Sequence, residues 1–287
     1  ITRNSINSMI TSIIFSKDRP LQLDLCLKSL NKNFPDSENL VIYNNSSEFV
    51  ESYEILKSEH SQVEYWPQSN SLSSDIYLAA QSSDNDYICF FTDDDIFYKK
   101  CLPIRQDILD NKDVMCLSLR MGANINQRSH EGNIFQDVAA EMYQLDENTI
   151  CWNKTRNAYG SYWSYSLSVD GHIFRKQDIL DIFDEMNYLN ERYRWTQTPN
   201  TIESIMQRFW TTTPPMMASF PHSVVVNSPN NRVQDSHLAN KSGEVYDYTS
   251  KDLLEKYMQG SRINIDNLDF GEIKCPHTEI DIIKGLE

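Results

Sequence analysis

Glycine is scarce in this chain, with only 8 glycines among 287 residues. Loops that wrap phosphates in backbone N–H groups need glycines at fixed spacings, and neither GxGxxG nor GxxxxGK[ST] occurs in the sequence. The two common glycine-rich nucleotide-binding loops are therefore excluded. Long apolar runs are missing too, since none approaches the roughly 20 residues that a membrane-spanning helix needs.

Positive charge is also in short supply. The chain has 26 Lys and Arg against 41 Asp and Glu, which gives a formal net charge of −15. A surface that binds nucleic acid or an anionic membrane needs clustered Lys and Arg, and no such cluster appears. We therefore expect neither as a partner. A small anionic ligand is still compatible, because a metal ion or a few arginines reverse the sign locally.

The six cysteines contain no CxxC pair. Cys26, Cys89 and Cys116 lie in apolar runs, where a reduced thiol behaves as a small hydrophobic group. This usage indicates a reducing compartment. Because no signal peptide is recognisable, we expect a cytoplasmic protein.

The first hundred residues alternate between strand and helix patterns. This alternation predicts βαβ units and an α/β fold with a mostly parallel sheet flanked by helices. Pro20 suits the first turn of the first helix, and Asp18 is its expected cap. The predicted strands are 9–16, 39–47, 62–66 and 86–92, and the predicted helices are 18–34, 46–60 and 71–83.

Ligands of such sheets bind beyond the carboxyl ends of the strands. The segments FSKDRP, YNNSS and TDDD follow the first, second and fourth predicted strands, so we expect them on one edge of the sheet. The second half is less regular. We predict helices at 101–111, 176–189, 198–210 and 250–259, strands at 114–120 and within 222–231, and hairpins over 133–153.

Three adjacent aspartates, Asp93, Asp94 and Asp95, stand in the stretch FFTDDDIFY. A run of three acids is ordinarily a solvated turn, but apolar segments flank this one on both sides. Carboxylates between buried segments need a cation to offset their repulsion, and Mg²⁺ or Mn²⁺ suits them well. If the chain stays extended, Asp93 and Asp95 face one side and Asp94 points away.

The stretches TSIIFSKDRPLQLDLCLKSL, VIYNNSS and YICFFTDDDIFY together resemble the nucleotide-sugar half of a GT-A glycosyltransferase, most nearly the inverting, family-2-like enzymes. The resemblance continues more weakly through YSLSVDGHIFRKQDI and TPNTIE. It implies a GT-A catalytic domain over 1–228, with a nucleotide-sugar half at 1–98 and an acceptor half at 99–228. Residues 229–287 would form a C-terminal extension.

The function that this resemblance implies is metal-dependent transfer of a hexose from a nucleoside diphosphate sugar to a hydroxyl acceptor such as a glycan, with inversion. In that family a DxD motif at the end of the fourth strand binds Mn²⁺ or Mg²⁺ on the diphosphate. Asp95 would bind the metal directly, and Asp93 would bind the metal or the ribose. Asp94 would be mainly structural, though it lies in the same site. The implied nucleotide-site residues are Phe15, Ser16, Arg19, Asn44, Asn45, Asp75, Asp93, Asp94 and Arg232.

Asn44 and Asn45 stand where the family often has an aspartate that reads uracil. An amide offers both a donor and an acceptor, so another base is compatible. We favour a UDP-sugar donor and keep a GDP-sugar as the alternative. Asp75 is read equally well as a helix-surface acid, and Arg232 as a solvated loop arginine.

Glu203 is our choice for the general base, because a carboxylate in the first turn of a helix is favoured in its ionised form. The alternative is a capping-box glutamate without chemistry. Asp170 is the second candidate, with a turn aspartate as its alternative. Some GT-A enzymes complete the metal shell with a histidine, and His237 or His222 would serve here, although a lone histidine is more often structural or exposed.

The aromatic segment with Tyr159, Tyr162, Trp163 and Tyr165 is either core or a wall that stacks on an acceptor sugar. Two other functions remain open from the sequence. A metal-dependent phosphoesterase would use the acids to activate water. A non-catalytic protein that binds nucleotides or carbohydrates on a GT-A fold would explain the missing aspartate near Asn44.

Overall fold

The computed structural model describes residues 10–130, 133–189, 198–233 and 242–287. Within these ranges a nine-stranded sheet has the order β3-β2-β1-β4-β11-β6-β12-β10-β9. Its first half pairs in parallel, as predicted: β1 (Ile10–Lys17), β2 (Ser37–Asn44), β3 (Glu64–Pro67) and β4 (Tyr87–Thr92). The predicted α/β fold is therefore confirmed.

The second half of the sheet is mixed. β11 (His172–Arg175) runs antiparallel to both β4 and β6 (Val114–Ser118). β12 (Met216–Ser219), β10 (Thr149–Asn153) and β9 (Tyr143–Asp146) complete it. Two small ladders stand apart: β7 (Gln127–His130) pairs with β8 (Asn133–Gln136), and β5 (Asp95–Phe97) pairs with β13 (Val225–Asn227).

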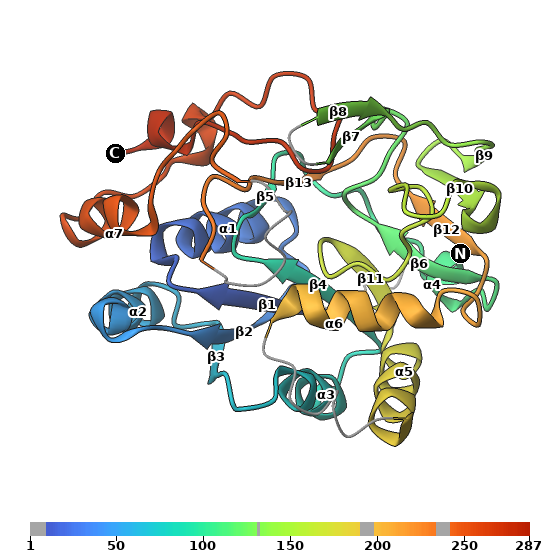
Figure 1. The fold of residues 1–287 in the computed structure, drawn as a ribbon, viewed down its shortest axis with the longest axis horizontal. Helices are drawn as coiled ribbons and strands as arrows, with labels where there is room; N and C mark the ends of the chain where they lie inside the picture. Colours follow the sequence, from blue (N-terminus) through green and yellow to red (C-terminus); the bar gives the residue numbers. More distant parts are fainter. Residues whose placement is uncertain (1–9, 131–132, 190–197, 234–241) are drawn as a thin grey trace, which may run out of the picture.

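Helices cover both faces of the sheet (Figure 1). α3 (Leu72–Ser82) packs beside α5 (Lys176–Leu189) on one side, and α1 (Pro20–Asn33) covers the other. α2 (Val50–Glu59), α4 (Gln106–Asp110), α6 (Pro199–Met206) and α7 (Ser250–Met258) complete the described helices. Each of these helices is too short or too polar to cross a bilayer.

Two local predictions differ from the structure. The helix predicted over 101–111 is limited to α4, because Pro103 lacks an N–H and restrains the residue before it. Asp18 does not cap α1, since Arg19 occupies the N-cap position. Asp18 instead has φ of 52°, and its carboxylate accepts hydrogen bonds from the backbone N–H and hydroxyl of Ser46 at 2.7 and 3.2 Å. It thereby ties the loop after β1 to the loop after β2.

Candidate active site

The three loops that the sequence places on one edge of the sheet do lie there. Parallel pairing sets Lys17 opposite Asn44, and Phe15 opposite Thr92. The loops border a cavity of about 1310 Å³. Small-molecule sites usually occupy roughly 300–1,000 Å³. The space is therefore sufficient for a nucleotide sugar and part of a second substrate.

Two of the three aspartates form a turn, and the third begins the next strand. β4 ends at Thr92, the chain turns at Asp93 and Asp94, and β5 begins at Asp95. The chain does not stay extended, so the alternation that would place Asp93 and Asp95 on one face does not arise. Asp93 and Asp94 line the cavity, whereas Asp95 is fully buried and does not line it. The acid expected to bind the metal directly thus faces the core, and the acid expected to point away faces the cavity.

Asp95 is held in the core by neutral donors. The backbone N–H of Thr92 donates to its Oδ2 at 2.8 Å, and Nδ2 of Asn227 donates to its Oδ1 at 3.1 Å. Burial, followed by repulsion from Asp170 and Asp94, raises the pKa of Asp95 well above its usual value. These contacts fix the position of the turn from the core side.

Arg19 pairs with the two acids that face the cavity. Its Nη1 lies 2.9 Å from Asp93 Oδ1 and 3.0 Å from Asp94 Oδ2. The side-chain oxygen and the carbonyl of Asn231 accept hydrogen bonds from the rest of the guanidinium. Burial nevertheless raises the pKa of Asp93 to about 6, although Arg19 lowers it. Asp93 and Asp94, which we call the acid turn, thus present two carboxyl groups to a single arginine.

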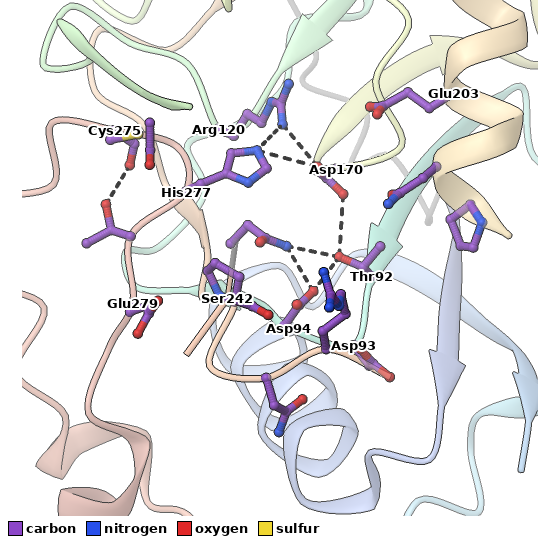
Figure 2. Close-up of a pocket in the computed structure, with 18 of the residues that line it drawn as sticks. Thr92, Asp93, Asp94, Arg120, Asp170, Glu203, Ser242, Cys275, His277 and Glu279 are labelled. Atoms are coloured by element: carbon purple, nitrogen blue, oxygen red, sulfur yellow. Dashed lines mark hydrogen bonds and ion pairs between the residues drawn. The ribbon is translucent and has the colours of Figure 1, made fainter. Parts of the chain in front are cut away.

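Asp170 links the acid turn to Arg120, in the second half of the sheet. The hydroxyl of Thr92 lies 2.7 Å from Asp94 Oδ1 and 3.4 Å from Asp170 Oδ1 (Figure 2). Arg120, just beyond β6, places Nη1 3.1 Å from Asp170 Oδ2 and 3.2 Å from Nε2 of His277. Arginine is always a donor, so Nε2 of His277 accepts. Burial and then Arg120 lower the pKa of His277, which keeps its imidazole neutral.

Glu203 reaches from α6 toward the pair of Asp170 and Arg120 (Figure 2). Its place in the helix differs from the sequence prediction. Thr198 is the cap and Pro199 begins α6, so Glu203 is the fifth helical residue and lies outside the first turn. The capping-box interpretation is therefore wrong.

The carboxylate of Glu203 makes tertiary contacts instead. Its Oε1 accepts hydrogen bonds from the Ser168 hydroxyl at 2.7 Å and from the Val169 N–H at 3.1 Å. Burial, followed by repulsion from Asp170, raises the pKa of Glu203 to about 7. A carboxylate with this pKa, half-buried at the wall of a cavity, suits proton transfer near neutral pH.

Of the nine predicted nucleotide-site residues, seven line the cavity and two do not. Ser16 donates to Asp93 Oδ2 at 2.9 Å and so connects the first loop to the acid turn. Asp75 does not line the cavity, and its carboxylate accepts from the Ser69 N–H at 2.8 Å, which braces the start of α3. Asn45 does not line the cavity either. Those that do line it are Phe15, Ser16, Arg19, Asn44, Asp93, Asp94 and Arg232.

The aromatic segment divides between the core, the cavity and the exposed surface. Trp163 is buried, donates its ring N–H to the Asp137 carbonyl and packs edge-on against Trp152. It therefore belongs to the core. Tyr162 and Tyr165 line the cavity, whereas Tyr159 is exposed and outside it. Of the predicted histidines, His222 is exposed and does not line the cavity, and His237 lies outside the described residues.

Three further residues of the site were not found from the sequence. Arg120 ends the predicted strand 114–120, so the rule that ligands bind at carboxyl ends could have singled it out. Asn227 and His277 carried no local signal, since each reaches the site only through tertiary contacts. The C-terminal segment 242–287 borders the cavity with Ser242, Cys275, His277 and Glu279 (Figure 2).

A divalent metal ion is implied by the resemblance, and the residues fit one. Asp94 and Asp170 both face the cavity and both contact the Thr92 hydroxyl. Mg²⁺ is commonly held by one or two carboxylates together with substrate phosphates. Among the described residues, no group of three or more His, Cys, Asp and Glu side chains is arranged to hold a metal. An ion here would therefore take its remaining ligands from a substrate or water.

The helix-flanked sheet and the acid turn at its carboxyl edge define the class of protein, a GT-A glycosyltransferase fold. The sequence matches the model of glycosyl transferase family 2 over residues 11–183, which is more than half of the chain. The chain belongs to glycosyl transferase family 2.

Solved structures that this chain matches include residues 1–349 of TarS from S. aureus, with a TM-score of 0.48 and 12% identity over 75% of this chain and 59% of that one. The complex of the same protein with UDP-GlcNAc has a TM-score of 0.46 and 12% identity, over 75% and 57% of the two chains. A cytidylyltransferase from Leptospira borgpetersenii has a TM-score of 0.40 and 13% identity, over 88% and 94%. This chain thus spans somewhat more than half of those TarS structures. It matches none of the curated proteins with which it was compared.

Proposed function

We propose that the protein transfers a hexose from a nucleoside diphosphate sugar to a hydroxyl acceptor such as a glycan, with inversion and with dependence on Mn²⁺ or Mg²⁺. One observation carries the proposal. Glu203, with a pKa near 7, shares a single cavity with the acid turn of Asp93 and Asp94. An inverting transferase needs this combination, because the base and the donor site must meet at one anomeric carbon.

The donor would occupy the edge formed by the loops after β1, β2 and β4. Phe15 and Asn44 line the part of the cavity that would hold the nucleoside. We favour a UDP-sugar and keep a GDP-sugar as the alternative, because the amide of Asn44 can read either kind of base edge. Asp94 and Asp170 would hold the metal ion, which would supply positive charge to the diphosphate.

The acceptor would enter beside Glu203. Ser168 and Val169 orient its carboxylate through Oε1. The carboxylate takes the proton of the acceptor hydroxyl as that oxygen attacks the anomeric carbon, and the bond from that carbon to the diphosphate breaks so that the nucleoside diphosphate leaves. Tyr162 and Tyr165 line the cavity and offer ring faces on which an acceptor sugar can stack. Asp170 is the second candidate for the base, although its pairing with Arg120 makes it less available.

The test is a panel of UDP- and GDP-sugars with purified protein, in Mn²⁺ or in EDTA, with thermal unfolding and nucleotide release as readouts. We expect one donor class to raise the melting temperature and to be hydrolysed slowly without an acceptor, both only with metal. If no donor binds or turns over, the proposal is wrong. Phosphate release from simple phosphomonoesters would favour a phosphoesterase. Nucleotide binding without turnover would favour a non-catalytic binding protein.

A further inference from the structure

A polar stretch, residues 227–231 with the sequence NSPNN, is buried between the acid turn and the C-terminal segment; we call it the NSPNN segment. Buried amides and hydroxyls cost free energy unless they are hydrogen-bonded. The partners of these side chains therefore show what the segment does. Their exposed fractions are 6% for Asn227, 1% for Ser228, 1% for Asn230 and 9% for Asn231.

Asn227 contacts two of the three aspartates. It ends β13 directly opposite Asp95 of β5. Its Nδ2 lies 2.9 Å from Asp94 Oδ1, 3.1 Å from Asp95 Oδ1 and 3.0 Å from the Thr92 hydroxyl. An amide nitrogen carries two hydrogens, so it can donate to both carboxylates at once. The neutral side chain of Asn227 thus connects Asp94, which faces the cavity, with Asp95, which faces the core.

The same segment holds three other parts of the site. The N–H of Ser228 donates to the carbonyl of Asp94 at 2.8 Å, and Asn231 accepts from the guanidinium of Arg19. The backbone of Asn227 pairs with Pro276 and Thr278, at 2.9 Å in each case. This pairing sets His277, which lies between those two residues, beside the acids.

The amide is chemically suited to its position. Asp94 and Asp95 already place two carboxyl groups against it, so another acid would add repulsion. A lysine or arginine in its place would pair with Asp94 and compete with a cation bound in the cavity. A neutral donor avoids both effects.

We propose that Asn227 is a positioning residue for the donor site, whose amide keeps the Asp94 carboxylate in the cavity and the Asp95 carboxyl in the core. This inference rests on the proposed function, because the donor is the ligand that the arrangement serves. Asn227 itself need not touch the donor. Its effect on turnover is exerted through Asp94.

Two substitutions and one matched control test this role. Asn227→Ala removes the donor hydrogens and leaves a small void, whereas Asn227→Asp keeps the size and replaces the donor by an acceptor. Asn230→Asp makes the same chemical change three residues away, where the side chain bonds to the Ile280 carbonyl and the Ser228 hydroxyl. Steady-state kinetics at pH 8 in Mn²⁺ gives donor KM, acceptor KM and kcat for each variant.

We expect both Asn227 variants to raise donor KM by about tenfold or more, because each loses hydrogen bonds to a charged group. Acceptor KM should change much less, and Asn230→Asp should leave donor KM within about twofold. Donor KM within about twofold of wild type in both Asn227 variants would overturn the proposal. An equal rise in Asn230→Asp would also overturn it, since the effect would then be general loosening of the segment.

Thermal unfolding in metal-free buffer at pH 8 gives a readout that does not depend on turnover. If Asn227 only fills space, the isosteric Asn227→Asp should lower the melting temperature less than Asn227→Ala. If its amide holds the two carboxyl groups, Asn227→Asp should lower the melting temperature more, because the new carboxylate repels Asp94 and Asp95. If the wild-type protein binds no nucleoside diphosphate sugar, the proposed function fails, whereas the order of melting temperatures still tests whether the Asn227 amide holds the Asp94 and Asp95 carboxyl groups in place.

Discussion

The sharpest test of the proposed base is the substitution Glu203→Gln. Glutamine keeps the size of the side chain and an oxygen that can accept from Ser168 and Val169, but it cannot take a proton. General-base catalysis contributes about 10²- to 10⁴-fold to rate, so kcat should fall by that factor. Donor KM should change little, because Glu203 makes no described contact with the acid turn. In wild type, kcat should decline as pH falls below about 7, where Glu203 becomes protonated.

The same substitution should stabilise the protein in a pH-dependent way. The pKa of Glu203 rises from its usual 4.5 to about 7 on folding. At pH above 7 the folded protein therefore carries a cost for ionising this half-buried carboxyl, and below 4.5 that cost is absent. The shift corresponds to roughly 1–3 kcal/mol, allowing for partial solvent screening. Glu203→Gln should therefore melt higher than wild type at pH 8, with the gain shrinking toward pH 5.

Steady-state kinetics and thermal unfolding at both pH values provide the assay, with the exposed Glu51→Gln as the control. An unchanged kcat would refute Glu203 as the base. A gain in melting temperature that is equal at pH 5 and pH 8 would refute the raised pKa.

Three other changes follow from the same structure. Asp94→Asn should raise donor KM by about tenfold or more. The control is Asp36→Asn at an exposed position, which should leave donor KM unchanged. Equal donor KM in the two variants would argue against a donor contact by Asp94. Gly122→Ala should lower the melting temperature by several degrees, because the new Cβ would lie 2.4 Å from the backbone nitrogen of Ser223; an unchanged melting curve would contradict that packing. EDTA should stop donor turnover and added Mn²⁺ should restore it, while turnover that survives EDTA would remove the metal from the proposal.

The first half of the fold is readable from local patterns. Apolar runs of strand length alternate with amphipathic helices, and each predicted element from β1 to β4 appears within a few residues of its expected bounds. Parallel pairing then places the three loops on one edge, which is a consequence of connectivity and not of any particular side chain. The segments that contain Phe15, Ser16 and Asp93 were placed at this edge in this way, whereas the roles of these residues were implied by the family resemblance.

Side-chain direction at the acid triplet was not readable. In an extended strand every second side chain points to the same side, so Asp93 and Asp95 would point the same way. A turn at Asp93 and Asp94 breaks that alternation. The run of acids is itself a local sign of a turn, but the direction of each side chain depends on distant partners. Arg19 and Asn227 hold the turn from segments 75 and 133 residues away in the sequence.

The sequence by itself determined the class of fold, the edge of the sheet where the candidate site lies and the acids that gather there, because these depend on periodicity and chain direction. Only the tertiary structure decided which aspartate faces the cavity, that Glu203 lies beside Asp170, and that the C-terminal segment brings His277 to the same place. Those outcomes depend on hydrogen bonds and ion pairs between distant segments. Such contacts form only when the sheet has brought the segments together, so no local pattern encodes them.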